Sequence, residues 1–212
     1  MIALSRRLVQ ALFLAGAVAI AIGAPLARAA WADTKDDGKA IVQRMADQVV
    51  NILANQGMDR AAKEARFRQI LGHNFDVPTI GAWVMGPPWR GATPAQRAEY
   101  LKLFESYIVK VYTGQLSTYS GEKVIVTGAD ADGGGVEVVS RITDPKNDRT
   151  VEVKWRMRQS GAQLKVRDVV IENISMSQTQ RREFAAVFQQ RGNSVDGLIA
   201  ALREKIAELD RQ

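Results

Sequence analysis

Apolar residues recur at three- and four-residue spacing in the first and last parts of the chain, which is the period of an amphipathic helix. The first such stripe contains Ile41, Met45, Val49, Ile52 and Leu53. The pattern predicts six helices: from about Gly38 to Ala54, after Asp59 to Gly72, from near Asp76, from Thr93-Pro94 onwards, from Ser177 to Gly192, and after Ser194.

Several of these helices carry a recognisable start. Thr93-Pro94-Ala95-Gln96 fits a capping box with proline at the first helical position. Ser177 and Gln180 have the spacing of a second capping box. Asp59 and Ser194 are residue types that favour the N-cap position, so we expect them to begin the second and the last helix.

Between the two helical regions the apolar period changes to two, which is typical of half-buried strands. Val151, Val153, Trp155 and Met157 alternate with charged residues, and similar runs surround Val124, Val138 and Val170. The turns between the runs are short, so neighbouring strands are expected to pair in sequence order. The predicted fold class is α+β, with a four-stranded antiparallel meander against a layer of helices.

The first residues have the three parts of a secretory signal peptide. Arg6 and Arg7 precede the apolar run Leu8 to Gly23, and Ala27-Arg28-Ala29 supplies small residues at a cleavage site. The apolar run is short for a membrane span. We therefore expect residues 1–29 to be removed and residues 30–212 to form a single exported domain.

Charge and composition exclude several classes of function. The formal charge is +6, and Arg6, Arg7 and Arg28 carry three of these charges, so the mature chain is expected to carry +3. Its basic residues are interleaved with acids, which argues against nucleic-acid binding. The chain has no cysteine and one histidine, His73, so neither a disulfide nor a typical zinc site is expected.

One pair of acids remains as a candidate for chemistry. Asp168 and Glu172 lie on the stretch between the last strand and the following helix. A buried carboxylate pair can perform acid–base chemistry. Salt bridges from Asp168 to Arg156 or Arg167 are the competing interpretation. No glycine-rich phosphate loop or other cofactor motif accompanies the pair, so no cofactor is expected.

Aromatic and aliphatic residues are abundant on the helix that follows Pro94 and on the sheet. The periodicity by itself does not distinguish a filled core from a lined cavity. A structural protein with a filled core, an enzyme using Asp168 and Glu172, and a carrier of apolar ligands therefore all remain open at this point.

Three segments, in this order, resemble the MlaC family. They are Gly91-Ala92-Thr93-Pro94-Ala95-Gln96-Arg97 with the residues that follow, Val153-Lys154-Trp155-Arg156, and Ile174-Ser175-Met176. The resemblance covers roughly Phe75 to Arg203. Members of this family are periplasmic auxiliary proteins of a phospholipid ABC transport system, and the hopanoid-associated relative HpnM is similar.

The resemblance implies a sheet curled against helices around an apolar cavity for phospholipid tails, without catalysis. Implied partners are an outer-membrane lipoprotein complex and an inner-membrane ABC transporter with an MCE-domain protein. The expected function is a periplasmic lipid carrier between these complexes, working as a monomer. A hopanoid-type lipid is the alternative cargo. Gly86-Pro87-Pro88-Trp89 replaces part of a tyrosine-rich segment of the family, at the expected cavity mouth.

A cavity for two acyl chains should approach the upper limit of ligand pockets, about 1,000 Å³. From the apolar pattern we expect a lining of sixteen residues. From the helices these are Val84, Trp89, Tyr100, Phe104, Tyr107, Ile108, Val111 and Tyr112; from the sheet and its exit, Val138, Val153, Trp155, Val170, Ile174 and Met176; and behind them Phe188 and Leu202.

Overall fold

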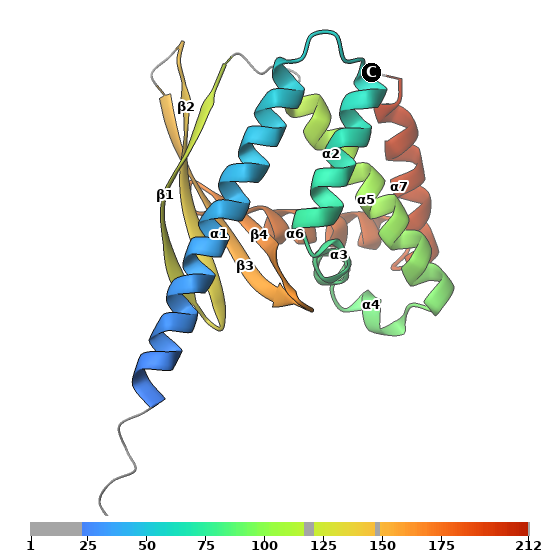
Figure 1. The fold of residues 1–212 in the computed structure, drawn as a ribbon. Coiled ribbons are helices and arrows are strands. Elements are labelled where there is room, and N and C mark those ends of the chain that lie inside the picture. Colours follow the sequence, from blue (N-terminus) through green and yellow to red (C-terminus); the bar gives the residue numbers. More distant parts are fainter. Residues whose placement is uncertain (1–22, 117–120, 147–148, 212) are drawn as a thin grey trace, which may run out of the picture.

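The computed structural model describes residues 23–116, 121–146 and 149–211. The described chain is an α+β structure in which helices pack against one antiparallel sheet (Figure 1). The helices are α1 (Gly23–Ala54), α2 (Arg60–Asn74), α3 (Val77–Met85), α4 (Pro88–Gly91), α5 (Pro94–Leu116), α6 (Met176–Gln190) and α7 (Val195–Leu209). The strands are β1 (Lys123–Asp132), β2 (Gly135–Asp144), β3 (Arg149–Ser160), β4 (Gln163–Ile171) and β5 (Ile174–Ser175).

The sheet is a meander in which the strands pair in the order β1-β2-β3-β4-β5. This confirms the antiparallel sheet but corrects the expected number of strands from four to five. The additional strand, β5, is only two residues long and forms a hairpin with the end of β4. Glu172 and Asn173 make its turn with φ values of 48° and 66°. Two consecutive left-handed residues favour a tight hairpin, and this pair lacks the glycine that usually marks one.

Side-chain caps begin most of the helices, as the sequence predicts. Thr93 and Gln96 form the reciprocal capping box: the Gln96 N–H donates to Thr93 Oγ1 over 3.2 Å, and the Thr93 N–H donates to Gln96 Oε1 over 2.9 Å. Asp59 caps α2, and Ser194 caps α7.

The predicted capping box at Ser177 and Gln180 is wrong. The cap of α6 is Ser175, whose hydroxyl accepts from the Gln178 N–H over 3.1 Å. The Ser177 N–H donates instead to Asp168 Oδ1 over 3.1 Å. Asp168 lies on β4, so a carboxylate from the neighbouring strand accepts one of the free N–H groups at the start of α6, beside the Ser175 cap.

Helix α1 crosses the face of the sheet and then continues beside α2 (Figure 1). It begins at Gly23 rather than near Gly38, so it is longer than predicted. A Cβ atom at Gly38 would lie 3.0 Å from both Val136 Cγ1 and Val138 Cγ2. The missing side chain therefore lets the helix lie close against β2. Most of the predicted leader, residues 1–22, lies outside the described residues.

Among the described residues no helix is both long enough and apolar enough to span a bilayer.

The buried residues form two clusters rather than one. The sheet cluster joins Val42 of α1 to Val136, Val138, Met157 and Val166 of the strands. The helical cluster is centred on Tyr100, Phe104 and Phe184, where aromatic rings from α5 and α6 pack at centroid distances of 5.8–6.2 Å. Phe75 contacts both clusters from the connection between α2 and α3.

Candidate functional site

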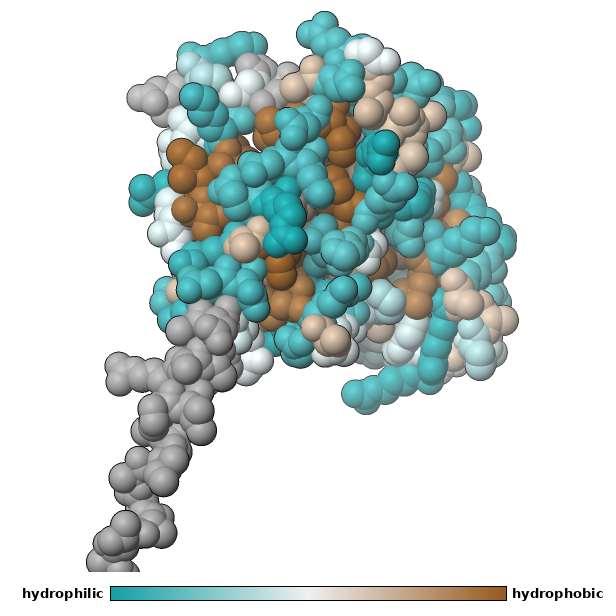
Figure 2. All heavy atoms as spheres, viewed as in Figure 1, coloured by the Kyte–Doolittle hydropathy of each residue, from teal (hydrophilic) through white to brown (hydrophobic). Residues whose placement is uncertain are grey.

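An apolar pocket with a volume of about 440 Å³ lies between the two clusters. Its wall includes Phe104 from the helical cluster and Val153 and Trp155 from β3. In the space-filling view, apolar atoms are visible between the more hydrophilic surfaces of α1 and α2 (Figure 2). The pocket is therefore a place where the sheet layer and the helical layer do not fill the space between them.

Three walls line the pocket. One wall is the inner side of α1 with Met45, Ala46, Val49, Val50 and Leu53. A second wall consists of residues from α2, the connection after it, α3 and α5: Phe67, Ile70, Leu71, Phe75, Val77, Ile80, Val84, Phe104, Ile108 and Tyr112. The third wall comes from the sheet and the start of α6: Val124, Ile142, Val153, Trp155, Val169, Ile171 and Met176.

Polar residues occur mainly on one part of the wall. Besides Glu122, which precedes β1, the polar lining residues are Arg167 and Asp168 of β4 and Ser177 and Gln180 of α6. The junction of β4 with α6 is thus the polar side of an apolar pocket. A ligand with long hydrocarbon parts and few polar groups would match this distribution.

Arg167 is held by Asp76, the N-cap residue of α3. The Arg167 Nε donates to Asp76 Oδ2 over 3.2 Å, and Nη2 lies 3.0 Å from the same oxygen. Burial would raise the pKa of Asp76, but hydrogen bonds from Thr79 and the charge of Arg167 outweigh it, so the pKa lies below its usual value. This ion pair joins β4 to α3 beside the pocket.

Asp168 is also fully engaged in protein contacts. Its Oδ2 accepts from the Ser175 hydroxyl over 2.7 Å and lies 3.5 Å from Arg156 Nη1. Its Oδ1 accepts from the Ser177 N–H. An acid at the start of a helix is stabilised by the helix dipole. The carboxylate therefore fastens α6 to the sheet.

The two candidate acids, Asp168 and Glu172, do not lie together in one site. Glu172 lies in the β4–β5 turn, its side chain is 55% exposed, and its carboxylate lies 3.9 Å from Arg149. Asp168 instead faces the start of α6 and is largely buried. In the described part of the chain no group of three His, Cys, Asp or Glu residues is arranged to hold a metal ion.

Comparison with known proteins agrees with this architecture. A family model described as MlaC protein matches residues 43–204. The chain belongs to the MlaC family. The family assignment confirms the resemblance inferred from the Thr93-Pro94-Ala95-Gln96 segment and the tryptophan strand.

Two curated relatives in the MlaC family have similar sequences. The toluene tolerance protein ttg2D of Pseudomonas putida is 27% identical over 141 residues, which are 66% of this chain and 66% of that protein. The intermembrane phospholipid transport system binding protein MlaC of Haemophilus influenzae is 21% identical over 178 residues, covering 79% of this chain and 81% of that protein.

A solved structure has a similar fold. It is the phospholipid-binding protein from Ralstonia solanacearum in complex with a phospholipid. The TM-score is 0.68 with 27% sequence identity, and the match covers 82% of this chain and 99% of that chain.

In this MlaC-family chain, seven of the sixteen predicted lining residues lie on the pocket wall. On α5 they follow a spacing of four, because one face of the helix is turned towards the pocket. The seven are Val84, Phe104, Ile108, Tyr112, Val153, Trp155 and Met176.

The other nine predicted residues are not among those that line the pocket. Tyr100 and Leu202 belong to the helical cluster, and Trp89, Tyr107 and Phe188 pack against it. Val138 is in the sheet cluster. Val170 is buried on β4, Val111 is half-buried on α5, and Ile174 on β5 is 55% exposed. Helix α5 also packs against α7 and α3, so much of its aromatic stripe fills contacts between helices.

The largest omission from the prediction is α1. Its residues Met45, Val49 and Leu53 line the pocket, at the same four-residue spacing that predicts the helix. The sequence shows the apolar stripe, but it does not show against which element the stripe packs. Phe67, Ile70 and Leu71 of α2 escape the prediction for the same reason.

Proposed function

We propose that the chain is a periplasmic lipid carrier whose pocket holds acyl chains of a phospholipid. The main support for this proposal is the apolar pocket between α1, the sheet and the helical cluster. The phospholipid bound by the Ralstonia solanacearum protein supports it further, because that protein shares the fold and 27% of its residues with this chain.

Hydrocarbon burial would dominate the affinity. Each buried methylene group contributes about 0.8 kcal/mol, so a chain of about sixteen carbons gains roughly 13 kcal/mol relative to water. One neutral hydrogen bond to a head group contributes only about 1 kcal/mol. A membrane offers nearly the same burial as the pocket. Transfer between membrane and protein is therefore nearly balanced in free energy, and a carrier can both load and unload.

The pocket volume limits the amount of hydrocarbon that the protein can bind. About 440 Å³ is within the usual range for ligand pockets but less than half of the volume expected for two acyl chains. Met45 and Leu53 of α1, which the prediction did not include, also line this space. The pocket as it stands therefore matches one acyl chain better than two.

The proposal includes the route and the partners. Residues 1–29 act as a cleaved signal peptide and direct the domain, residues 30–212, to the periplasm. There the carrier exchanges lipid with an outer-membrane lipoprotein complex and an inner-membrane ABC transporter complex. The name of the Haemophilus influenzae relative, a binding protein of an intermembrane phospholipid transport system, supports this arrangement. The expected role is binding and not catalysis.

Native mass spectrometry of the exported protein, purified without detergent, tests the proposal. We expect a population whose mass exceeds that of the residue 30–212 chain by the mass of one phospholipid. Collisional activation should release the additional mass as an intact lipid. A folded protein that carries no lipid, even after incubation with phospholipid vesicles, would contradict the carrier function.

A further inference from the structure

A second surface combines an exposed tryptophan with arginines, on a segment of the chain that itself contains no acid. Between Asp76 and Glu99 the chain has no aspartate or glutamate, but it has two arginines and two tryptophans. These residues belong to α3, α4 and the start of α5, which lie together at one edge of the molecule (Figure 1). Together with one arginine from α6 they form a surface that we call the Arg–Trp face, made of Trp83, Trp89, Arg90, Arg97 and Arg181.

Cation–π contacts and two hydrogen bonds, which Arg97 donates to the Trp89 and Arg90 carbonyls, connect the members of this face. The Arg181 guanidinium lies over the Trp83 ring, 4.1 Å from its centroid. The Arg97 guanidinium lies 5.2 Å from the centroid of the Trp89 ring, and its Nη2 donates to the Arg90 carbonyl over 3.0 Å. Arg181 also lies beside Gly86, 3.4 Å from the position of a Cβ there. The face is therefore continuous from α6 across α3 to α4.

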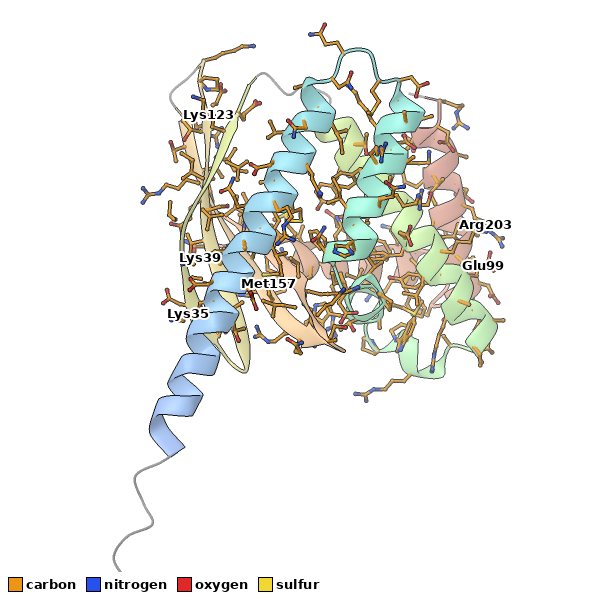
Figure 3. The ribbon with its side chains drawn as sticks, in the orientation of Figure 1. Lys35, Lys39, Glu99, Lys123, Met157 and Arg203 are labelled. Atoms are coloured by element: carbon orange, nitrogen blue, oxygen red, sulfur yellow. The ribbon has the colours of Figure 1, made fainter. Side chains whose placement is uncertain are left out.

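The positive charges of this face are not neutralised by the protein. No carboxylate among the described residues forms an ion pair with Arg90, Arg97 or Arg181, although fifteen other close ion pairs are present. The acids that flank the segment are already engaged: Asp76 with Arg167, and Glu99 with Arg203 (Figure 3).

We propose that the Arg–Trp face docks the protein on an anionic membrane surface. Arginines attract anionic phosphates electrostatically, and a tryptophan that is half in water and half on apolar surface suits the interfacial region of a bilayer. Trp83 is 50% exposed, and its indole is oriented by Arg181. Because the pocket is proposed above to carry phospholipid, docking there would bring it, through the neighbouring Val84 of its wall, close to the membranes that hold its partner complexes.

An acidic protein surface is the other chemical match, but the face lacks the apolar centre of a stable protein interface. Trp83 is the only large exposed hydrophobic residue of the face; the other two in the described chain, Ile125 and Ile174, are on the sheet. Binding to a membrane surface depends on buried apolar area plus attraction to anionic lipids, so one aromatic residue together with three arginines favours weak and reversible docking there.

Vesicle co-sedimentation of the mature, full-length domain tests this proposal. We compare phosphatidylcholine vesicles with and without phosphatidylglycerol, at low and high salt. The wild-type protein should sediment with the anionic vesicles at low salt and be released as salt screens the charges. Each arginine near an anionic surface contributes a factor of about five in affinity. Arg90→Gln combined with Arg181→Gln should therefore weaken binding roughly twenty-five-fold. Trp83→Ser should weaken it several-fold, because an interfacial aromatic anchor is lost.

Ile125→Ser and Lys123→Gln on β1 are the matched controls, since they remove an exposed apolar residue and a positive charge from a different surface. They should bind as the wild type does. Circular dichroism and bound lipid mass verify that the variants remain folded and loaded. The proposal would be overturned if the wild-type protein did not bind anionic vesicles at low salt, or if the variants of the face bound as well as the controls. Either result would leave a protein partner as the occupant of the face. Loss of bound lipid would instead count against the proposed carrier function, and not against docking on the membrane.

Discussion

The indole Nε1 of Trp155 donates a hydrogen bond to the Oγ of Ser140 over 2.9 Å. The Ser140 hydroxyl in turn lies 3.4 Å from the Val153 carbonyl and donates to it. Ser140 is completely buried, whereas the Trp155 ring lines the pocket. A single buried hydroxyl therefore fixes the orientation of the aromatic ring on the sheet wall of the pocket.

Replacing Ser140 with alanine should destabilise the domain by about 1–3 kcal/mol, because the indole N–H would lose its acceptor inside the protein. The free energy of unfolding in urea measures this loss. Thr127→Ala is the matched control: its hydroxyl also donates to a strand carbonyl, that of Val139, but it is exposed. This control should cost about 0.5 kcal/mol or less. Equal losses for the two variants would show that the buried pair has no special role.

Asp76 should make the stability of the domain depend on pH in the acid range. Its pKa is lower in the folded protein than the usual value, which is near 3.9 in an unfolded chain. Such a carboxyl stabilises the fold above the unfolded-state pKa, and its contribution is lost as the pH falls through the folded-state pKa. Wild-type stability should therefore decrease as the pH falls below about 4.

The Asp76→Asn variant should be less stable than the wild type at pH 7, by about 0.5–1 kcal/mol, because Arg167 loses its partner. It should also lose less stability on acidification. Urea unfolding over a pH series measures both effects. Asp130→Asn provides the comparison, because the Asp130 carboxylate is 87% exposed and 3.7 Å from Lys35. If the stability of the Asp76 variant fell more steeply with acid than that of the wild type, the lowered pKa of Asp76 would be contradicted.

The contact between α1 and β2 at Gly38 should not tolerate a large side chain. Gly38→Leu must displace α1 or the valines that it faces, at a cost of about 1–3 kcal/mol. Gly72→Leu on α2 is the matched control, since a Cβ atom at Gly72 would meet nothing within 4 Å. The control should retain or gain stability through better helix propensity. Thermal unfolding of the two variants gives the comparison, and equal midpoints would mean that α1 does not need this close approach.

The elements of this fold follow from local pattern, and most of them are predictable. Thr93 and Gln96 indicate the start of α5, and the alternation around Trp155 indicates β3, because caps and strand periodicity involve residues close in sequence. The strand β5 escapes prediction because two residues are too few to show a period. The start of α6 is misplaced by two residues because Ser175 and Gln178, which form the actual cap, have the same spacing as Ser177 and Gln180, so the local pattern does not distinguish the two.

Which residues line the pocket is less predictable, because the lining depends on where the packed layers leave space between them. Tyr100 and Phe104 belong to the same stripe, but only Phe104 reaches the pocket, because Tyr100 is held in the helical cluster and donates to the Gly81 carbonyl over 3.0 Å. Met45 carries an equally clear pattern on α1. Its position opposite the sheet depends on contacts between residues that are far apart in the sequence, and the period of the apolar residues does not predict such contacts.

Occupation of the pocket by hydrocarbon is the property on which the carrier function depends, and Ile108→Trp probes it at the wall itself. Ile108 is a half-buried lining residue on α5, so an indole there would fill space now open to a ligand. Ile125→Trp on β1, where the side chain is 57% exposed, adds the same group outside the pocket. Native mass spectrometry of both purified variants measures bound lipid per folded chain. We expect Ile108→Trp to lose most of its lipid while Ile125→Trp retains it, and unchanged lipid in a folded Ile108→Trp protein would contradict a lipid-filled pocket.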